Sequence, residues 1–403
     1  MTNWQELERK YLMNTFKRLP VTLVRGEGAR VWDEHGKEYL DFVAGWAVNL
    51  LGHCHPEIVA AVSEQAHTLM QVSNQFYSVP QIRLAELLVE NSCFDKVFFC
   101  NSGAEANEGA VKLARRYGKL HLGGAYEVIT AMNSFHGRTL AMVAATGQPK
   151  FQEPYTPLPD GFVNVEYNSI EAIKRATGEK TCAVMLEAIQ GEGGVNVPKE
   201  DYLKEVSSWC DERGVLLILD EIQTGMGRTG SLFAYQHYGI KPDIMTLAKG
   251  LAGGVPIGAF LAKDEVSVFA PGEHGSTFGG NPLACAAGYA TLKFILEHDV
   301  VENCRHVGNY LKASLEGLRA KCEKIVEVRG RGLLVALEFS SDIADGVVKA
   351  CLEEGLLLNA VKPSALRFMP PLIIGEKEVN EAMGILERVL ARVSKEGGSK
   401  VSL

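Results

Sequence analysis

The residues best suited to chemistry are an acid and a lysine that each follow a buried strand. The apolar run 215–219 ends at Asp220, and the run 244–248 ends at Lys249, which precedes a glycine. Both runs are typical of strands in a parallel sheet, whose carboxyl ends meet at one ligand-binding edge. A lysine that bonds to an aldehyde and an acid that keeps a pyridine nitrogen protonated suit pyridoxal phosphate. For this pair alone, the alternative is a surface lysine and an acid that caps a turn.

Two further loops could hold other parts of such a cofactor. Ser102 would cap a helix after a strand, and the free N–H groups at Gly103 and Ala104 could bind phosphate. An ordinary capped helix is the alternative. After the next strand, Phe135 could stack on a flat ring and Arg138 could bind a carboxylate. The alternative there is a core phenylalanine and a surface arginine.

Three more segments add candidate polar groups. Glu187 follows a strand and precedes a glycine-rich loop, so its carboxylate could act as a gate rather than as an acid or base. Ser276 and Thr277 lie in a long glycine-rich loop, and their hydroxyls could bind phosphate unless the loop is merely flexible. Arg367 lies in a strand-like segment and could bind a carboxylate.

The elements that must position these residues indicate an α/β fold. From residue 96, short apolar strands alternate with helical segments, which predicts a mostly parallel central sheet flanked by helices. After residue 281, long helices and strand-like segments suggest a smaller α+β domain. We therefore predict an N-terminal segment (1–50) that packs with the small domain, a large cofactor-binding domain (51–285) and a small C-terminal domain (286–403).

Composition excludes several classes of protein. The net charge of −8 without a basic block argues against nucleic acid or an anionic membrane as partner. No apolar stretch reaches the roughly 18 residues that span a bilayer, and the N-terminus lacks the apolar core of a signal peptide. The nine cysteines are scattered without a CxxC pair, which favours free thiols in the cytoplasm and no metal site.

The order and spacing of the motifs resemble the class III aminotransferases, which depend on pyridoxal phosphate and have fold type I. The resemblance covers nearly the whole chain. The motifs that carry it are GHCHP (52–56), NSGAEANE, FHGRT, QGEGG, DEIQTGMGRTG, LAKG, HGSTFGGNPLACAA, RGRGLL and RFMPPLII.

The resemblance implies a role for each candidate around the cofactor. Lys249 would bond to the aldehyde and then move the proton, while Asp220 would pair with the ring nitrogen. Gln223 would contact the ring hydroxyl, with Glu221 and Ile222 beside it. Phe135 would stack on the ring, and Ser102, Gly103 and Ala104 would hold the phosphate. Thr277 would reach the phosphate of the partner subunit, so that a homodimer shares its active sites.

The resemblance also implies two substrates that use one site in turn, in arginine biosynthesis. The terminal δ-amine of N2-acetyl-L-ornithine would pass to the cofactor, leaving N-acetylglutamate 5-semialdehyde, and then to 2-oxoglutarate, giving glutamate. Arg138, helped by Ser276, would bind the α-carboxylate of the donor, and Arg367 that of glutamate. Glu187 would pair with Arg367 when the donor has no use for that arginine.

Other substrates on the same scaffold stay open. These are ornithine, succinylornithine, succinyl-diaminopimelate, 4-aminobutyrate and a carrier-bound lysine. An aminomutase or amino-acid racemase is the alternative of a different class. The chain departs from the family at Ala188, where proline is usual, and at Trp46, which either lines the substrate tunnel or packs at the dimer interface.

Overall fold

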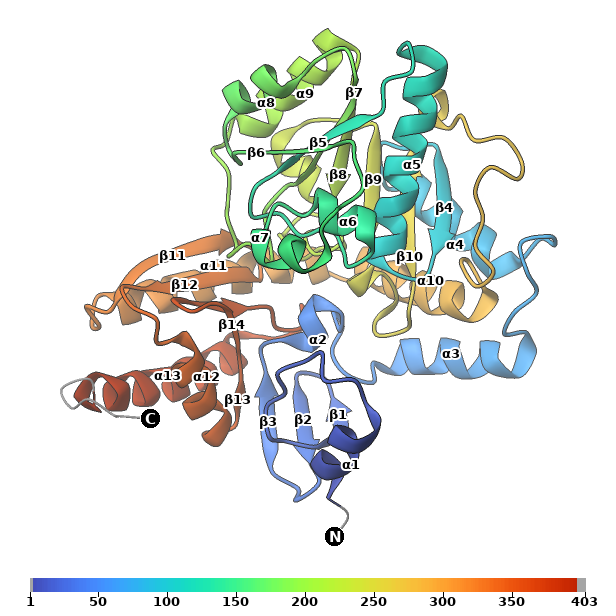
Figure 1. Ribbon diagram of the computed structural model, residues 1–403. Coiled ribbons are helices and arrows are strands. Elements are labelled where there is room, and N and C mark those ends of the chain that lie inside the picture. The colour runs from blue at the N-terminus through green and yellow to red at the C-terminus, as the bar shows by residue number, and fades with distance from the viewer. Residues whose placement is uncertain (1–2, 397–403) are drawn as a thin grey trace.

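The central sheet of the computed structural model, which describes residues 3–396, has seven strands in the order β4-β10-β9-β8-β7-β5-β6 (Figure 1). In that order the strands are Lys96–Cys100, Gly258–Ala262, Ile244–Leu247, Leu216–Asp220, Thr181–Glu187, Glu127–Ala131 and Phe162–Val165. The pairs from β9 to β6 are parallel, and β10 runs antiparallel to both β4 and β9. The predicted α/β fold with a mostly parallel sheet is confirmed.

Helices cover both faces of this sheet. In β8, Leu216 and Ile218 face a core shared with α5 (Gly103–His121), whereas Leu217 and Leu219 face the opposite core. This alternation explains why the strand is apolar throughout, because neither face meets water. In Figure 1, α5 and α6 (Leu140–Ala145) lie on one side of the sheet, and α8 (Ile170–Ala176) and α9 (Tyr202–Arg213) lie on the other.

The remaining helices of this region support the edge of the sheet where the candidate residues lie. α10 packs against α3, α4 and the 3₁₀ segment η3, which begins at Lys249. The bounds are Pro56–Thr68 for α3, Val79–Glu90 for α4, Pro149–Gln152 for α7, Glu153–Tyr155 for η1, Ala234–Tyr238 for η2, Lys249–Ala252 for η3, Asp264–Val266 for η4 and Pro282–Glu297 for α10.

The C-terminal third forms a second, four-stranded sheet in the order β11-β12-β15-β14, packed with helices α11 to α13. The strands are Ile325–Arg331, Leu334–Phe339, Ala365–Phe368 and Asn359–Lys362, and the helices are Val300–Arg319, Ala344–Glu353 and Glu376–Glu396. We keep the division at residues 285 and 286 as a proposal, and it falls within α10.

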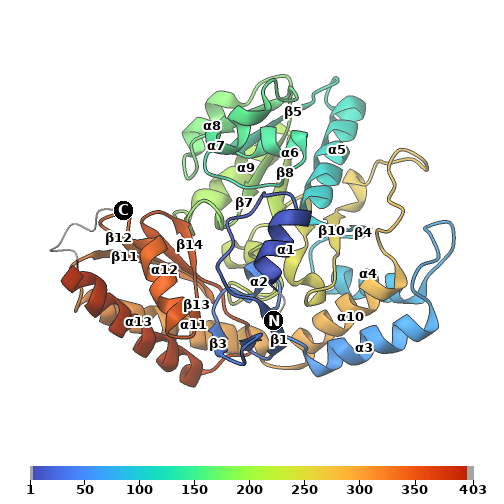
Figure 2. The ribbon, with the colours of Figure 1, turned by 60° about the horizontal axis from the view of Figure 1, so that its bottom comes forward.

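The N-terminal segment contributes a third sheet, in the order β1-β2-β3-β13. Because β13 comes from the C-terminal third and pairs in parallel with β3, the two ends of the chain share this sheet (Figure 2). The elements are α1 (Trp4–Tyr11), β1 (Leu23–Glu27), β2 (Arg30–Asp33), β3 (Glu38–Asp41), α2 (Ala44–Ala47) and β13 (Leu356–Leu357). Residues 1–2 and 397–403 of the proposed outer segments lie outside the described part of the chain.

Candidate active site

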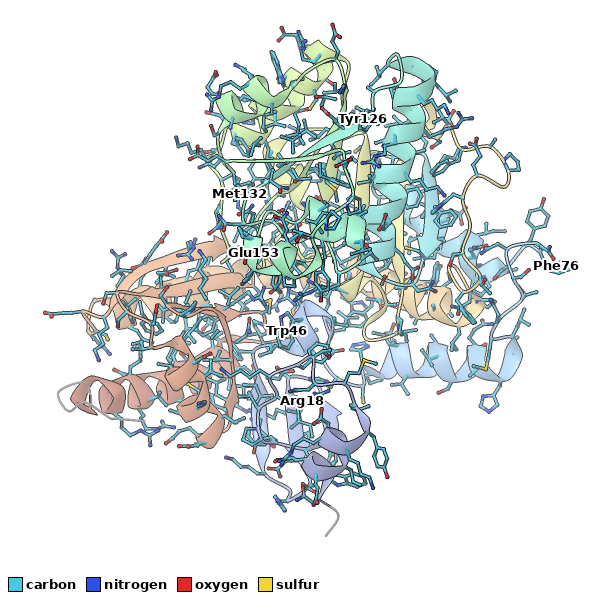
Figure 3. All side chains as sticks on the ribbon, viewed as in Figure 1. Arg18, Trp46, Phe76, Tyr126, Met132 and Glu153 are labelled. Atoms are coloured by element: carbon cyan, nitrogen blue, oxygen red, sulfur yellow. The ribbon has the colours of Figure 1, made fainter. Side chains whose placement is uncertain are left out.

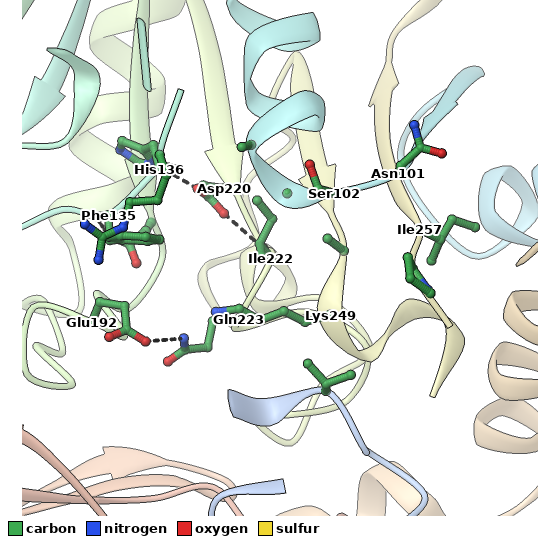
Figure 4. Close-up of a pocket in the computed structure, with 18 of the residues that line it drawn as sticks. Asn101, Ser102, Phe135, His136, Glu192, Asp220, Ile222, Gln223, Lys249 and Ile257 are labelled. Atoms are coloured by element: carbon green, nitrogen blue, oxygen red, sulfur yellow. Dashed lines mark hydrogen bonds and ion pairs between the residues drawn. The ribbon is translucent and has the colours of Figure 1, made fainter. Parts of the chain in front are cut away.

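A cavity of about 420 Å³ opens at the carboxyl ends of the parallel strands (Figure 4). Ten predicted site residues line it: Ser102, Gly103, Ala104, Phe135, Arg138, Glu187, Asp220, Ile222, Gln223 and Lys249. Ten residues that the sequence analysis did not select line it as well: Val48, Asn101, His136, Gly137, Glu192, Ala248, Gly254, Val255, Pro256 and Ile257. The strand ends therefore assemble one site, as expected for an open α/β sheet.

Asp220 is a buried acid held by three donors. Its Oδ2 accepts hydrogen bonds from Asn107 Nδ2 and His136 Nδ1, both at 2.8 Å, and its Oδ1 accepts one from Ile222 N at 3.0 Å. Burial opposes protonation of His136, but Asp220 raises the pKa of the imidazole above its ordinary value. The three donors fix the direction of the carboxylate toward the cavity.

His136 and Asn107 are functional candidates that the sequence analysis missed. Both side chains are buried, and His136 Nε2 and Asn107 Oδ1 have no hydrogen-bond partner among the described residues. A signal was present for Asn107, because it lies one helical turn after Gly103 and so shares that residue's face of α5. For His136 the only signal was its place directly after Phe135.

The N-terminus of α5 forms a small cradle at one end of the cavity. Ser102 Oγ accepts a hydrogen bond from Glu105 N at 3.2 Å, which caps the helix. A Cβ atom at Gly103 would lie 2.7 Å from Ile222 Cδ1, so a larger residue here would displace the Ile222 side chain. The first N–H groups of a helix have no partner within the helix, so those of Gly103 and Ala104 can receive an anion.

Lys249 begins η3 immediately after β9 and lines the cavity. Its side chain has no hydrogen bond or ion pair with another described residue, and burial lowers the pKa of the amine while Glu192 opposes this effect. Its backbone has a φ of 44°, in the left-handed region that a lysine adopts only at a cost of about 1 kcal/mol or more. Such strain at a cavity-lining residue is typical of a functional site.

Arg138 and Phe135 lie beside one another on the loop after β5. The guanidinium of Arg138 stacks on the ring of Phe151, with 4.1 Å between the guanidinium carbon and the ring centroid, and lies 5.4 Å from that of Phe135. The Arg138 side chain is exposed, and its donors make no hydrogen bond or ion pair with another described residue. The stacked guanidinium is therefore oriented and available to bind a carboxylate at the mouth of the cavity.

The expected pair between Glu187 and Arg367 is wrong, because Arg367 pairs with Glu192. The distance from Arg367 Nη1 to Glu192 Oε1 is 2.8 Å. The Glu187 carboxylate instead accepts hydrogen bonds from Phe135 N and Gly191 N, both at 3.1 Å. Burial raises the pKa of Glu187 to about 7. Glu187 ends β7 opposite Asp220, and the following turn carries Glu192 instead toward the arginine.

Glu221 does not belong to the cavity lining, contrary to expectation. Its carboxylate accepts hydrogen bonds from Ala234 N at 2.6 Å and Tyr235 N at 2.7 Å, at the start of η2. Asp220, Ile222 and Gln223 line the cavity, whereas the Glu221 carboxylate points toward the start of η2. The role of Glu221 in this structure is to hold the following segment in place.

Ser276 and Thr277 also lie outside the cavity lining of the single chain. Ser276 Oγ accepts hydrogen bonds from Gly279 N at 2.9 Å and from Asn101 Nδ2 at 3.2 Å, and Asn101 lines the cavity. Thr277 is exposed. Trp46 is likewise absent from the lining: it is 49% exposed on α2, where the N-terminal segment faces the large domain (Figure 3).

No helix of the described chain is both long and apolar enough to cross a membrane. Within residues 3–396, no group of three or more acidic, histidine or cysteine side chains is arranged to hold a metal ion.

Comparisons with known proteins identify the family. The sequence profile "Aminotransferase class-III" matches residues 12–390. The acetylornithine aminotransferase of Caldanaerobacter subterraneus subsp. tengcongensis is 54% identical, over 96% of this chain and 98% of that protein.

Solved structures agree with this match. The acetylornithine aminotransferase of Elizabethkingia anophelis is 38% identical with a TM-score of 0.86, over 96% of this chain and 98% of that one. The ornithine aminotransferase of Toxoplasma gondii, in a structure with partially occupied pyridoxal phosphate, is 36% identical with a TM-score of 0.94. This match covers 98% of this chain and 96% of that one. From the site geometry and these similarities together, this chain belongs to the class III aminotransferases.

Proposed function

We propose that this protein is a pyridoxal-phosphate-dependent acetylornithine aminotransferase. It transfers the terminal δ-amine of N2-acetyl-L-ornithine to 2-oxoglutarate, a step of arginine biosynthesis. One observation carries the proposal: the unpaired Lys249 and the buried Asp220 follow neighbouring parallel strands and line the same cavity. The relative that is 54% identical over nearly the whole chain supports this choice of substrate.

The residues of the cavity fit the cofactor from several sides. Asp220, oriented by His136 and Asn107, would hold the pyridine nitrogen in its protonated form. The first turn of α5 would bind the phosphate, Phe135 would cover the ring, and Gln223 would meet the ring hydroxyl. When bound, pyridoxal phosphate supplies an aldehyde and an electron-withdrawing ring that stabilises negative charge beside the reacting carbon.

Lys249 is the base that the reaction requires. A lysine can take up a proton only when its amine is uncharged, and burial lowers the pKa of Lys249 toward that state. The nearby carboxylates of Glu192, Asp220 and Glu187 oppose this shift, whereas the charge of Arg367 adds to it.

Two arginines would distinguish the substrates. Arg138, helped by Ser276, would bind the α-carboxylate of acetylornithine and then the side-chain carboxylate of glutamate or 2-oxoglutarate. Arg367 would bind the α-carboxylate of glutamate. A terminal amine brings no carboxylate to Arg367, and Glu192 would neutralise the arginine in that half of the reaction.

A homodimer is part of the proposal. Thr277 is exposed in the single chain, and Phe76 and Tyr77, on a projecting loop, are 64% and 97% exposed (Figure 3). Apolar side chains this exposed are typical of an interface, through which Thr277 would reach the partner's cofactor phosphate. All nine cysteines are free, which supports a cytoplasmic location.

A panel of amine donors with 2-oxoglutarate tests the substrate. We expect acetylornithine to give the highest kcat/KM, with Lys249→Ala lacking both turnover and the visible absorption band of the bound cofactor. The second candidate is ornithine, favoured by the Toxoplasma gondii ornithine aminotransferase at a TM-score of 0.94. Equal or better use of ornithine or 4-aminobutyrate by the wild type would refute the acetylornithine assignment.

A further inference from the structure

Arg367 is held by two neutral amides as well as by one carboxylate. Its Nε and Nη2 donate to Asn359 Oδ1 at 3.0 and 2.7 Å, and its Nη1 donates to Gln223 Oε1 at 3.0 Å. Glu192 is its only ion-pair partner among the described residues. Neutral acceptors orient a guanidinium without cancelling its charge, so the arginine keeps its attraction for an incoming carboxylate.

The fold brings the two amides to Arg367 from different strands. Asn359 and Arg367 are direct partners in the antiparallel pair of β14 and β15, so their side chains lie on the same face of that sheet. The residue opposite Arg367 on its other side, in β12, is the small Ala336. Gln223 follows a strand of the large sheet, three residues after β8 ends. The arginine is thus held from two sheets at once.

The two members of the ion pair differ in how far they are buried. The Arg367 side chain is 0% exposed, whereas that of Glu192 is 25% exposed. Glu192 lies between Gly191 and Gly193, and in Figure 4 its carboxylate meets the Gln223 amide from the loop side. Of the two partners, Glu192 is therefore the one whose side chain has space to leave.

We propose that Asn359 and Gln223 form an amide cradle that keeps Arg367 stationary and fully charged while Glu192 exchanges with the α-carboxylate of glutamate. Asn359 is a positioning residue in this account, since it acts through Arg367. The inference rests on the proposed function, which supplies the two alternating substrates. It adds a specificity determinant: position 359 must accept two hydrogen bonds and must carry no charge.

The substitution Asn359→Asp separates these two requirements. An aspartate has the same shape and keeps an acceptor for Nε and Nη2, but its charge neutralises Arg367 permanently. We expect the dissociation constant of glutarate, an unreactive dicarboxylate, to rise at least about tenfold in calorimetric titration of the holoenzyme. The KM for glutamate should rise similarly, while the KM for acetylornithine stays within about twofold.

Two further variants complete the experiment. Asn359→Ala removes both hydrogen bonds without adding charge and should also weaken glutarate binding, by roughly tenfold. Asn380→Asp is the matched control: Asn380 also accepts a hydrogen bond, from Tyr310 OH at 2.8 Å, but it is on α13 and does not line the cavity. Its glutarate affinity should equal that of the wild type.

The inference is overturned if Asn359→Asp binds glutarate as tightly as the wild type, or if it weakens glutarate and acetylornithine equally. Should the aspartate variant fail to fold, unchanged glutarate binding by Asn359→Ala overturns it instead. Failure of the wild type to use acetylornithine would refute the proposed function only, because the glutarate and glutamate measurements do not involve that donor.

Discussion

Replacing Glu192 with glutamine should shift the enzyme toward glutamate. The variant keeps a hydrogen-bond acceptor for Arg367 Nη1 but removes the charge that competes with the α-carboxylate of glutamate. At the observed distance of 2.8 Å and an effective dielectric constant of about 20, the attraction between the two charges is roughly 6 kcal/mol. Because Glu192 is 25% exposed, and because the amide keeps its hydrogen bond, only part of this is lost.

We take about 2 kcal/mol as the net advantage that glutamate gains, within the range of roughly 1.5 to 7 kcal/mol measured for close charge pairs. This corresponds to about a 30-fold decrease in the KM for glutamate. The half-reaction with acetylornithine should slow, since the positive charge of Arg367 then remains uncompensated near the amine. Stopped-flow absorbance of the visible cofactor band measures each half-reaction separately.

Glu354→Gln is the matched control for this prediction. Glu354 also pairs with an arginine, Arg388, at 3.2 Å and is 26% exposed, but it does not line the cavity. It should leave both half-reactions unchanged. A Glu192→Gln enzyme with the same ratio of glutamate to acetylornithine efficiency as Glu354→Gln would refute the exchange of Glu192 with substrate.

Two more predictions concern residues around Asp220. His136→Leu removes a buried hydrogen-bond donor to the Asp220 carboxylate, and this loss should weaken cofactor binding by about 2 kcal/mol. Dialysis should therefore show cofactor retention that is roughly 30-fold weaker. Unchanged retention would contradict the role of His136. Glu221→Gln loses one of two backbone hydrogen bonds and should lower the midpoint of thermal unfolding by a few degrees. Burial raises the pKa of Glu221 to about 7, so the folded chain keeps a proton that the unfolded chain releases near pH 4.3. The contribution of Glu221 to stability is therefore complete below pH 4.3 and declines as the pH rises through 7, and a constant difference in unfolding free energy between wild type and variant would contradict this.

The sequence predicts the strand ends of the large sheet well, because buried parallel strands are continuous apolar runs. Asp220 and Lys249 follow two such runs, and the structure brings both into one cavity with the N-terminus of α5. The antiparallel direction of β10 was not predicted, since the apolar pattern of a buried strand is the same in either direction.

The partner of Arg367 could not be deduced from periodicity. Glu187 ends a strand, so its position is readable, whereas Glu192 lies in a glycine-rich loop whose path depends on contacts with the second sheet. The role of Asn359 could not be predicted for the same reason. It follows from the pairing of β14 with β15, and β14 is a short strand that the apolar pattern of the sequence does not indicate. The role that we propose for Thr277 depends on a second chain, which no single-chain pattern encodes.

The most direct test of the central claim is a stoichiometric measurement of the two half-reactions with purified holoenzyme. Acetylornithine added without any acceptor should bleach the visible cofactor band and release one equivalent of N-acetylglutamate 5-semialdehyde per cofactor. Subsequent 2-oxoglutarate should restore the band and yield one equivalent of glutamate. Bleaching by ornithine that is as fast as bleaching by acetylornithine, or no semialdehyde release at all, would contradict the account.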